Sequence, residues 1–307
     1  MSYAIVIVNW NGRDDTLACL ASIAAGGNGG QVIVVDNGSA DGSVAALRAA
    51  HPAATLIEAG QNLGFAAGAN LGLRAAHAAG FERVVFLNND TLVEGDALDR
   101  IVARLDAPDA FVTIPMLLVH DSGRIWNCGG EAYAIGLRRY HLAGQPREAG
   151  AARGEIRCSF VTGCCLALRT GPFLRRGGFC ERFFFGEEDF ELALWMRERQ
   201  LAGVCVTAAV VRHKVSASFS AAASASQARK VFLYYLNRFI HMRLRLGAWR
   251  WRAWCAAYLP YVLLLLWRGG TLRAAELPAF VRRLLGHART MDGVTRADFE
   301  AVMQGRL

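Results

Sequence analysis

Short apolar runs alternate with stretches of helical periodicity along the first hundred residues. Four of these runs have the length and the β-branched content of strands, namely Tyr3–Val8, Val32–Val35, Thr55–Ile57 and Val84–Leu87. Between the first two runs, Leu17, Leu20 and Ile23 recur at helical spacing. Strands that alternate with helices are typical of βαβ units, so the pattern predicts an α/β fold with a mainly parallel sheet flanked by helices.

Each of these runs ends at, or shortly precedes, a polar or glycine-rich segment. The segments are Asn9-Trp10-Asn11-Gly12, Asp36-Asn37-Gly38-Ser39, Asn62-Leu63-Gly64-Phe65 and Asn88-Asn89-Asp90. Parallel strands end at one edge of their sheet, and ligands of open α/β sheets bind outside that edge. The sequence therefore predicts a polar crevice of nucleotide size there.

Each segment also has a plainer interpretation. The carboxylate and amide oxygens of Asn88-Asn89-Asp90 suit a hard divalent cation that shares its shell with phosphates, but the same residues are good turn formers. Asp36 suits the ring N–H of a pyrimidine base, or it belongs to a turn that caps the next helix. Gly64 does not fit a dinucleotide-binding glycine pattern, although the N–H groups of the helix start near it suit a diphosphate. Together the segments favour the nucleotide interpretation.

A second cluster of polar side chains begins a predicted helix that runs to Arg199. Its acids are Glu187, Glu188, Asp189 and Glu191, and they follow the aromatic run Phe183–Phe185. Acids are favoured in a first helical turn, but these exceed what a cap needs. A carboxylate held beside apolar rings suits a general base. A lone histidine is usually structural; His213, however, ends the strand after this helix and is expected to face the same crevice.

The region between the two clusters shows a weaker pattern. Phe111–Leu118 and Phe160–Arg169 are predicted strands, whereas residues 123–154 are expected to form a long glycine- and arginine-rich loop. In that loop, Arg138, Arg139 and Arg147 either contact an anionic acceptor or are solvated surface charges.

The charge of the chain is concentrated near its C-terminal end. Residues 229–289 carry twelve Arg or Lys against Glu276 alone, a net charge of +11, whereas the whole chain carries +8. Only Lys214 and Lys230 are lysines, which indicates a general composition bias and argues against a nucleic-acid partner. The eight cysteines show no zinc spacing, so we expect buried free thiols.

The same region carries an apolar stretch of interfacial character. Residues 229–246 predict a basic helix with Phe232, Leu236 and Phe239 on its apolar side. The uncharged run that ends at Trp267 has about 15 residues, short of the roughly 20 needed to span a bilayer. Flanking arginines and tryptophans favour an interfacial anchor, and a buried helix hairpin is the alternative. In the anchor interpretation, the lipid contacts would be Arg229, Lys230, Arg238, Arg243, Arg245, Arg250, Arg252, Trp251, Trp254, Leu263 and Leu265.

The ordered set of motifs resembles family 2 inverting glycosyltransferases, and most closely their rhamnosyltransferase-like branch. The four strand-end segments, Gly177-Gly178-Phe179, Glu188-Asp189-x-Glu191-Leu192 and His213 carry this resemblance, which covers roughly residues 3–245. It implies a GT-A fold, which is a Rossmann-like nucleotide-binding domain whose C-terminal half holds the acceptor. The implied domains are 1–228, with a donor half to about 110 and an acceptor half after it, followed by a basic helical extension, 229–307.

The resemblance also assigns roles to single residues. It implies that Asp189 is the catalytic base, that Asp90 binds Mg²⁺ or Mn²⁺, and that His213 is a further metal or diphosphate contact. The donor would meet Asn9, Asn11, Asp36, Asn62, Gly64, Asn88 and Asn89, and the acceptor side would hold Glu188 and Glu191. The family usually has a carboxylate where this chain has Asn88, which weakens the expectation of strict metal dependence.

The expected reaction is an inverting transfer from a dTDP- or UDP-linked sugar, with rhamnose as a candidate, to a saccharide or lipid-linked acceptor. Synthesis of cell-envelope polysaccharide on the inner face of the cytoplasmic membrane is the setting that this implies. The alternatives are a non-catalytic nucleotide-sugar-binding protein and a membrane-associated scaffold. Asp90, Asp189 and His213 argue against both alternatives, because binding alone requires no base.

Overall fold

The computed structural model describes residues 2–214 and 225–307, which fall into two compact units. The described part of the first unit comprises residues 2–132, 138–180 and 188–214. The second unit comprises residues 225–307 with two short segments, Tyr133–Leu137 and Glu181–Glu187. Each unit is described by itself below.

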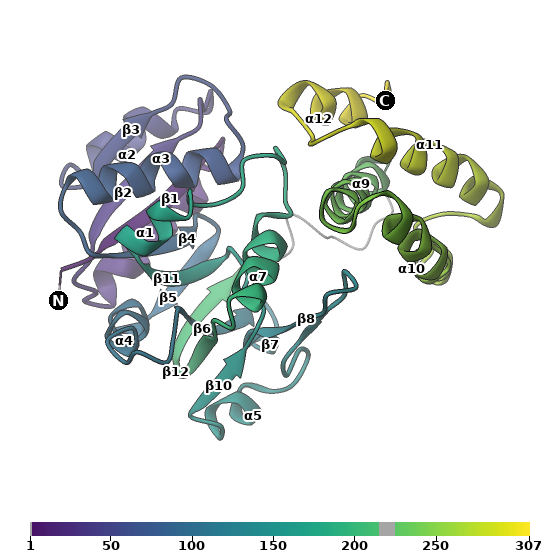
Figure 1. The fold of residues 1–307 in the computed structure, drawn as a ribbon. Coiled ribbons are helices and arrows are strands. Elements are labelled where there is room, and N and C mark those ends of the chain that lie inside the picture. Colours follow the sequence, from purple (N-terminus) through teal and green to yellow (C-terminus); the bar gives the residue numbers. More distant parts are fainter. Residues whose placement is uncertain (1, 215–224) are drawn as a thin grey trace. The chain divides into compact units, whose positions relative to one another are not determined.

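A mixed sheet forms the centre of the first unit. Its strands are β1 (Ala4–Asn9), β2 (Gln31–Asp36), β3 (Thr55–Glu58), β4 (Arg83–Asn88), β5 (Thr91–Glu94), β6 (Val112–Val119), β7 (Ile125–Asn127), β10 (Glu155–Cys158), β11 (Cys165–Arg169) and β12 (Gly203–His213). They lie in the order β10-β12-β6-β11-β4-β1-β2-β3, with β5 beside β12 and β7 beside β6 (Figure 1). The strands β3, β2, β1 and β4 are parallel to one another, which confirms the predicted βαβ units.

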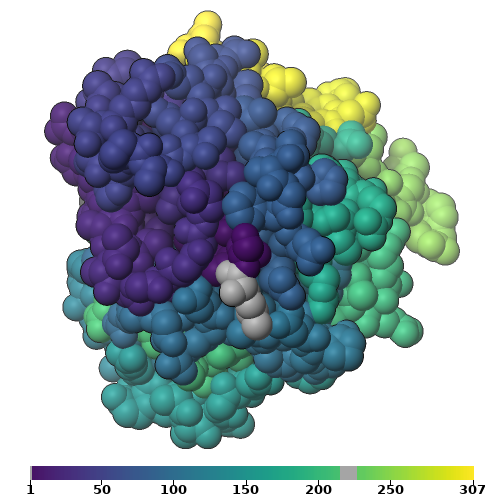
Figure 2. Space-filling model, turned by 90° about the vertical axis from the view of Figure 1, so that its left-hand side faces the viewer, coloured from purple at the N-terminus to yellow at the C-terminus, as the bar shows by residue number. Residues whose placement is uncertain are grey.

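Helices cover both faces of this sheet because its strands alternate between two apolar cores. The helices are α1 (Arg13–Ala25), α2 (Ser43–Ala50), α3 (Phe65–Ala78), α4 (Ala97–Arg104), α5 (Arg147–Ala151), α6 (Thr170–Arg175) and α7 (Glu188–Glu198). Ile5 and Ile7 of β1 pack in the core of α1, α2 and α4, whereas Ala4 and Val6 pack in the core of α3, α6 and α7. The N-terminal hundred residues form a continuous surface of this unit (Figure 2).

Two expectations for the middle of the chain need correction. The stretch expected as a loop, residues 123–154, contains β7 and α5 as well as a hairpin of β8 (Gly130–Ala132) and β9 (Arg138–Tyr140). These strands have three residues each, too short to show an alternating pattern. Of the predicted strand Phe160–Arg169, only β11 is a regular strand, and Phe160 makes an isolated bridge with Gly130.

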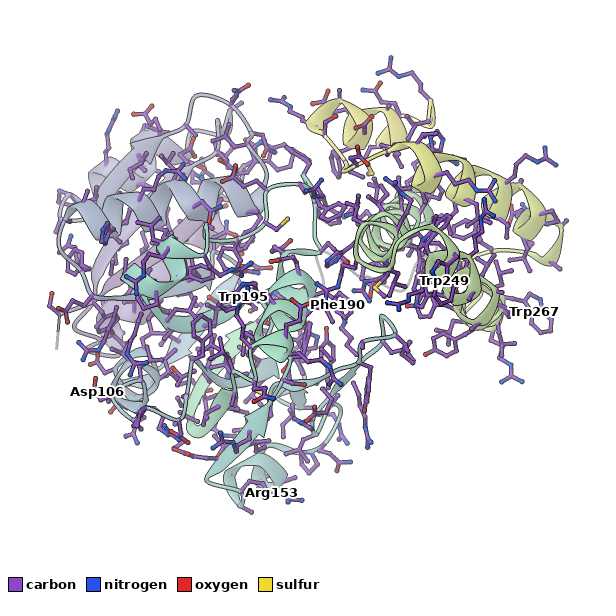
Figure 3. All side chains as sticks on the ribbon, viewed as in Figure 1. Asp106, Arg153, Phe190, Trp195, Trp249 and Trp267 are labelled. Carbon is purple, nitrogen blue, oxygen red and sulfur yellow. The ribbon has the colours of Figure 1, made fainter. Side chains whose placement is uncertain are left out.

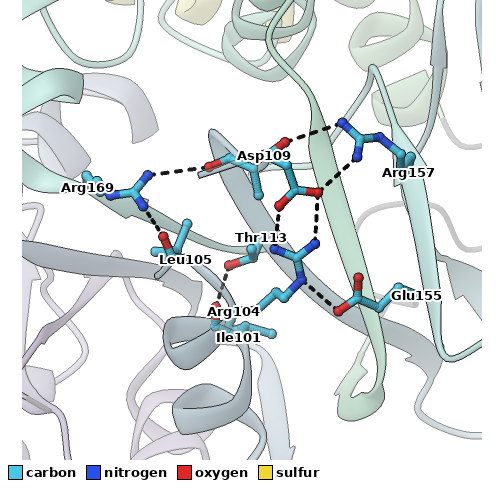
Figure 4. A network of polar contacts seen from close by, with 9 residues as sticks. Ile101, Arg104, Leu105, Asp109, Thr113, Glu155, Arg157 and Arg169 are labelled. Carbon is cyan, nitrogen blue, oxygen red and sulfur yellow. Dashed lines mark hydrogen bonds and ion pairs between the residues drawn. The ribbon is translucent and has the colours of Figure 1, made fainter. Parts of the chain in front are cut away.

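A polar network fastens the end of α4 to the strands beside it (Figure 4). Arg104 donates to the Asp109 carboxylate at 2.9 and 3.1 Å and to Glu155 at 2.7 Å, and Arg157 reaches Asp109 at 2.9 Å. The carboxylates raise the pKa of Arg104, and the hydrogen bonds that Arg104 donates to Asp109 are the largest cause. The network orders this part of the unit and contains none of the predicted site residues.

The second unit is helical around the long helix α9 (Ala225–Leu246). The other helices are α10 (Ala248–Arg268), the 3-10 helix η1 (Ala274–Glu276), α11 (Leu277–Thr290) and α12 (Arg296–Met303). Helix α9 packs against α10, α11 and α12, and Phe232, Leu236 and Phe239 are buried as predicted. Across residues 2–214 and 225–307, no helix combines the length and apolar character of a membrane span.

The structure corrects part of the predicted lipid surface. Trp251 and Trp254 are only 5% and 8% exposed, and their indole N–H groups donate to Phe239 O and Ile135 O within the second unit. Arg238 is also buried, at 1% exposure. Helix α10 is apolar on more than one face, so its sequence alone did not reveal which tryptophans form the core. The predicted burial of the cysteines is confirmed for seven of the eight, and Cys180 is half-buried.

Candidate active site

Three neighbouring strands bring predicted donor-site residues to one edge of the sheet. Asn9 is paired with Asp36 across β1 and β2, and Val8 is paired with Asn88 across β1 and β4. The carboxyl ends of these parallel strands therefore coincide, as the sequence predicted. The side chains that follow them form a continuous polar set, described below from β2 to β12.

Asp36 and Asn9 hold each other at the tips of β2 and β1. Asn9 Nδ2 donates to Asp36 Oδ1 at 2.8 Å, and Ser39 N donates to Asp36 Oδ2 at 2.9 Å. Asn9 Oδ1 in turn accepts from Thr16 Oγ1 at 2.8 Å. Both the nitrogen and the oxygen of the buried Asn9 amide are hydrogen-bonded, so the Asn9 side chain is held in place and orients Asp36. Each Asp36 oxygen keeps accepting capacity beyond these bonds.

The turns around this pair are fastened to each other. Asn11, whose φ is +51°, donates its backbone N–H to Ser39 Oγ at 2.9 Å and accepts from Ala40 N at 2.8 Å. Asn89 Nδ2 donates to Thr16 Oγ1 at 3.0 Å, so the segment after β4 is joined to helix α1. A left-handed backbone is accessible to asparagine, which explains its presence at position 11.

The start of helix α3 belongs to the same edge. Gly64 has a φ of +84°, a region that a residue with a Cβ rarely adopts, and its N–H donates to Asn62 Oδ1 at 2.9 Å. Asn37 Nδ2, next to Asp36, donates to Gly64 O at 3.0 Å. The loop before α3 is therefore fixed to the tip of β2. This arrangement suits close approach of a ligand to the helix start.

Asp90 and His213 meet where β4, β5 and β12 come together. His213 ends β12 and is paired with Thr91, and Lys214 N donates to Asp90 O at 3.0 Å. His213 Nε2 lies 3.2 Å from Asp90 Oδ1, within ion-pair distance but without the geometry of a hydrogen bond. Asp90 Oδ1 and His213 Nδ1 are both buried without a hydrogen-bond partner among the described residues.

This pair fits a divalent cation that shares its shell with a ligand. A carboxylate oxygen with unused accepting capacity next to an imidazole nitrogen offers two protein ligands. Within residues 2–214 and 225–307, no group of three or more His, Cys, Asp or Glu side chains is placed to hold a metal. The donor set therefore matches a cation completed by phosphate oxygens and waters, and not a closed structural centre. Asn88 adds no carboxylate to it.

The acids of α7 are paired with arginines from separate parts of the first unit. Asp189 Oδ2 lies 3.7 Å from Arg138 Nη1 of β9, and Glu191 Oε2 lies 2.6 Å from Arg176 Nη2. Arg176 also stacks over Trp195 at 4.6 Å, and Figure 3 shows Trp195 and Phe190 on α7. A guanidinium at 3.7 Å stabilises a carboxylate charge, but the distance is too long for a hydrogen bond between the two groups.

Glu188 connects α7 with the loop before β11. A Cβ on Gly163 would lie 3.8 Å from Glu188 Oε1 and 3.4 Å from the Phe65 ring at the start of α3. The Gly177-Gly178-Phe179 motif is linked to the same helix, because Asn70 of α3 exchanges two 2.8 Å hydrogen bonds with the Phe179 backbone. Gly178, with a φ of +72°, leaves room for that amide. Helix α3 therefore contacts the Gly177-Gly178-Phe179 motif, and Phe65 at its start lies near the same glycine, Gly163, as Glu188.

Three participants were not assigned a role from the sequence, and a fourth, Arg138, was expected to contact an anionic acceptor or to be a surface charge. Ser39, Thr16 and Asn70 complete the hydrogen bonds of the predicted residues, and Arg138 accompanies Asp189. A structural role for Asn70 could have been predicted, because it is an amide side chain within a helix of small apolar residues. The pairing of Arg138 with Asp189 could not have been predicted, because the two residues are 51 positions apart in the sequence. The predicted residues Asp36 and Asn9, and likewise Asp90 and His213, are in contact.

Comparisons with solved structures place this fold among glycosyltransferases. A mannosyltransferase from Pyrobaculum calidifontis, in complex with GDP-Man and Mn²⁺, is 18% identical with a TM-score of 0.56 and covers 92% of this chain and 86% of its own. TarS 1–349 of S. aureus is 13% identical, with a TM-score of 0.54, and covers 99% and 91%. GalNAc-T7 with UDP, GalNAc and Mn²⁺ is 15% identical with a TM-score of 0.56, and this chain spans 44% of its length. At these identities the likeness establishes the fold, and it confirms the predicted GT-A architecture.

Comparison with curated proteins finds no match. The sequence does match a protein family, described as glycosyl transferase family 2, over residues 4–176. The matched range contains the strand-end segments and the Asp90 turn, and it stops before α7. Because it makes up more than half of the chain, the match establishes that this chain belongs to glycosyl transferase family 2.

Proposed function

We propose that this protein transfers a sugar from a nucleoside-diphosphate donor to an acceptor hydroxyl, with inversion at the anomeric carbon. The observation that carries the proposal is the shared strand edge, at which Asp36 and Asn9 lie beside the turn that holds Asp90 against His213. A base-recognising carboxylate and a pair of cation ligands at one edge fit the two ends of a nucleoside diphosphate.

The donor would lie along this edge. Asp36, oriented by Asn9 and Ser39, accepts from the ring N–H of the base, which dTDP and UDP both offer. The N–H groups at the start of α3, after Gly64, face the diphosphate. Asn11, Asn62, Asn88 and Asn89 shape the turns around it. Asp90 and His213 would hold Mg²⁺ or Mn²⁺, which when bound supplies positive charge beside the departing diphosphate.

One base is sufficient for the reaction. Asp189 removes the proton of the acceptor hydroxyl while that oxygen attacks the anomeric carbon, and the bond to the nucleoside diphosphate breaks in the same displacement. A single displacement inverts the configuration and requires no second carboxylate as nucleophile. Arg138, whose Nη1 lies 3.7 Å from Asp189 Oδ2, places a positive charge beside the base before the acceptor binds. Glu188 and Glu191 orient the acceptor side.

The motif resemblance favours rhamnose as the sugar and a saccharide or lipid-linked glycan as the acceptor, in cell-envelope polysaccharide synthesis. The domain limits that accompany this proposal are 1–228 for the catalytic domain and 229–307 for the extension. A dTDP-linked donor would enter through the same contact of Asp36 with the base.

The helical extension would bring the protein to the inner face of the cytoplasmic membrane. Trp249 and Trp267 are 71% and 53% exposed and lie on α10, together with exposed Leu264 and Leu265 (Figure 3). A cavity of about 430 Å³ at the start of α10 is lined by Arg243, Arg252 and Arg289. Exposed tryptophans beside arginines suit the headgroup region of an anionic bilayer.

The function is tested with a panel of dTDP-, UDP- and GDP-linked sugars, first by thermal shift with Mg²⁺ or Mn²⁺ and then by transfer. The anomeric configuration of the product, read by NMR, must be opposite to that of the donor. Retention of configuration would contradict the role of Asp189. Donor binding without transfer to any saccharide or lipid-linked acceptor would favour the non-catalytic alternative.

Membrane docking is tested by co-sedimentation with vesicles that contain anionic lipid. Replacing Trp249 and Trp267 by serine is expected to weaken vesicle binding by about fivefold for each side chain. Each substitution removes apolar surface whose burial in the bilayer contributes roughly 1 kcal/mol to the binding free energy. Trp10→Ser removes a tryptophan of the first unit that is also 53% exposed, and it serves as the matched control. Equal loss with the control, or no binding by the wild type, would contradict the docking proposal.

A further inference from the structure

A buried arginine lies at the centre of the second unit. Arg238 of α9 is 1% exposed and donates through Nε to both oxygens of the buried Glu187, at 2.8 and 3.2 Å. Its Nη1 donates to Gly136 O. His241, one turn further along α9, lies 2.8 Å from Glu187 Oε1. Burial alone would raise the pKa of Glu187, but Arg238 and His241 outweigh burial and hold that pKa below its ordinary value.

The residues held by Arg238 belong to the two short segments of this unit that are distant from α9 in the sequence. Gly136 lies in Tyr133–Leu137 and Glu187 in Glu181–Glu187. Both segments have a second attachment to the helices, since Trp254 Nε1 donates to Ile135 O and Asn237 Nδ2 donates to Phe185 O, each at 2.7 Å. Glu187 also has a φ of +76°, a costly conformation for a residue with a Cβ, which persists only where its surroundings impose it.

The chain that follows each segment leads to a residue of the proposed chemistry. Two residues after Gly136 comes Arg138, and two residues after Glu187 comes Asp189. Within the first unit, Arg138 and Asp189 lie 3.7 Å apart. One guanidinium therefore holds a side chain two residues before the base and a backbone carbonyl two residues before the arginine that accompanies the base.

We propose that Arg238 and Glu187 are positioning residues for the transfer reaction, which act by fixing the chain segments that deliver Asp189 and Arg138. The inference rests on the proposed function, and it gives the helical unit a second task besides docking to lipid. Arginine suits this position because the N–H groups of its planar guanidinium can donate to a carboxylate and to a carbonyl at the same time. A displacement of about 1 Å at a reacting group lowers a rate by roughly 10²-fold, so such bracing matters for turnover.

The test separates position from stability with three variants. Arg238→Gln removes the charge and the planar guanidinium, Glu187→Gln keeps the shape but removes the counter-charge, and Arg238→Lys keeps a charge that pairs with Glu187 without reaching Gly136. Arg238→Gln is expected to lower kcat by about 10- to 100-fold while the Kd for nucleoside diphosphate stays within about twofold. Glu187→Gln should lower kcat similarly, and Arg238→Lys should recover part of it.

A stability-matched control is Leu284→Ala in α11, which empties a fully buried position of the same unit. At a temperature at which all variants are folded, it should leave kcat near that of the wild type. The proposal is overturned if Arg238→Gln keeps wild-type kcat, or if Leu284→Ala loses as much kcat as Arg238→Gln at an equal fall in Tm.

Hydrogen exchange distinguishes failure of this inference from failure of the proposed function, because it needs no substrate. In Arg238→Gln, peptides that cover residues 133–140 and 184–191 should exchange faster than in the wild type, while those of β1 and β4 should not change. If exchange is faster in Arg238→Gln but the protein transfers no sugar, Arg238 does fix these segments and the proposed function is wrong. Unchanged exchange in both segments would overturn the proposal that Arg238 fixes them.

Discussion

The two parts of the proposed site in the first unit are held together in different ways. At the strand edge, Asp36, Asn9, Thr16 and Asn89 bond to one another, and their positions follow from the register of neighbouring parallel strands. At the start of α7, the acids are instead paired with arginines, Asp189 with Arg138 and Glu191 with Arg176. The first set is a network of hydrogen bonds among polar side chains, and the second is a set of ion pairs between single acids and single arginines.

This difference indicates that the strand edge contributes mainly to donor binding and that α7 contributes mainly to the reaction. A network whose buried members satisfy each other keeps its shape before any ligand arrives, which favours tight and specific donor binding. A carboxylate next to a guanidinium that is not hydrogen-bonded to it can change partner when an acceptor hydroxyl arrives. We therefore expect substitutions at the edge to alter donor affinity first, and substitution of Asp189 on α7 to alter the rate first.

Replacing Asp189 by asparagine should give the largest effect. The amide keeps the shape but cannot accept the acceptor proton, so kcat is expected to fall by about 10²- to 10⁴-fold while donor affinity stays the same. Steady-state transfer and calorimetric binding of nucleoside diphosphate measure the two quantities. Glu198→Gln, at the last turn of the same helix, is the matched control. Retention of more than about a tenth of the rate would rule out Asp189 as the base.

The next largest effect is expected at the turn between β4 and β5. Asp90→Ala removes the carboxylate oxygen that faces His213, and we expect nucleoside diphosphate to bind about 10²-fold more weakly and without dependence on Mg²⁺ or Mn²⁺. Asp121→Ala, an exposed acid after β6, is the control. If EDTA leaves the wild-type affinity unchanged, the cation site is wrong, and the amide at Asn88 is the first place to seek the reason.

The strand edge was predictable from the sequence because local signals decide it. A strand has a period of two and a short length, and the polar tips of parallel strands must meet at one edge. That reasoning placed Asp36, Asn9 and Asn88 correctly at neighbouring strand ends. Asp90 and His213 are separated by more than a hundred positions, yet each follows a strand, so their meeting at one edge was also predictable.

The partners of α7 and the core of the helical unit were not predictable in this way. Arg138 begins β9, a strand of three residues in a hairpin, and Arg238 lies on a helix whose basic residues were predicted to contact lipid. Only the fold shows that Arg238 is buried against Glu187, whereas Arg245 and Arg250 are exposed. Nothing in the arginine-rich sequence of this helix distinguishes the buried Arg238 from the exposed Arg245.

Asn9→Ala should have an intermediate effect and should act on donor affinity, as expected for the strand edge. The substitution leaves Asp36 Oδ1 and Thr16 Oγ1 without the partners they have in the buried network. We expect a loss of about 1–3 kcal/mol in the free energy of unfolding and a weaker donor Kd, with kcat at saturating donor within about threefold. Urea unfolding and donor titration measure these changes. A fall in kcat as large as that of Asp189→Asn would break the distinction between the two regions.

The smallest effect on the reaction is expected from Glu191→Gln, which tests whether every acid of α7 takes part in chemistry. Glu191 pairs with Arg176 at 2.6 Å, and Arg176 is itself held over Trp195, so the pair orders the helix. Glutamine can still accept from Arg176 through its carbonyl oxygen, which leaves the geometry largely intact. The KM for acceptor is therefore expected to rise by about three- to tenfold while kcat stays within about twofold. Measured beside Asp189→Asn, a loss of kcat on the order of 10²-fold in Glu191→Gln would transfer the role of base, or a share of it, to Glu191.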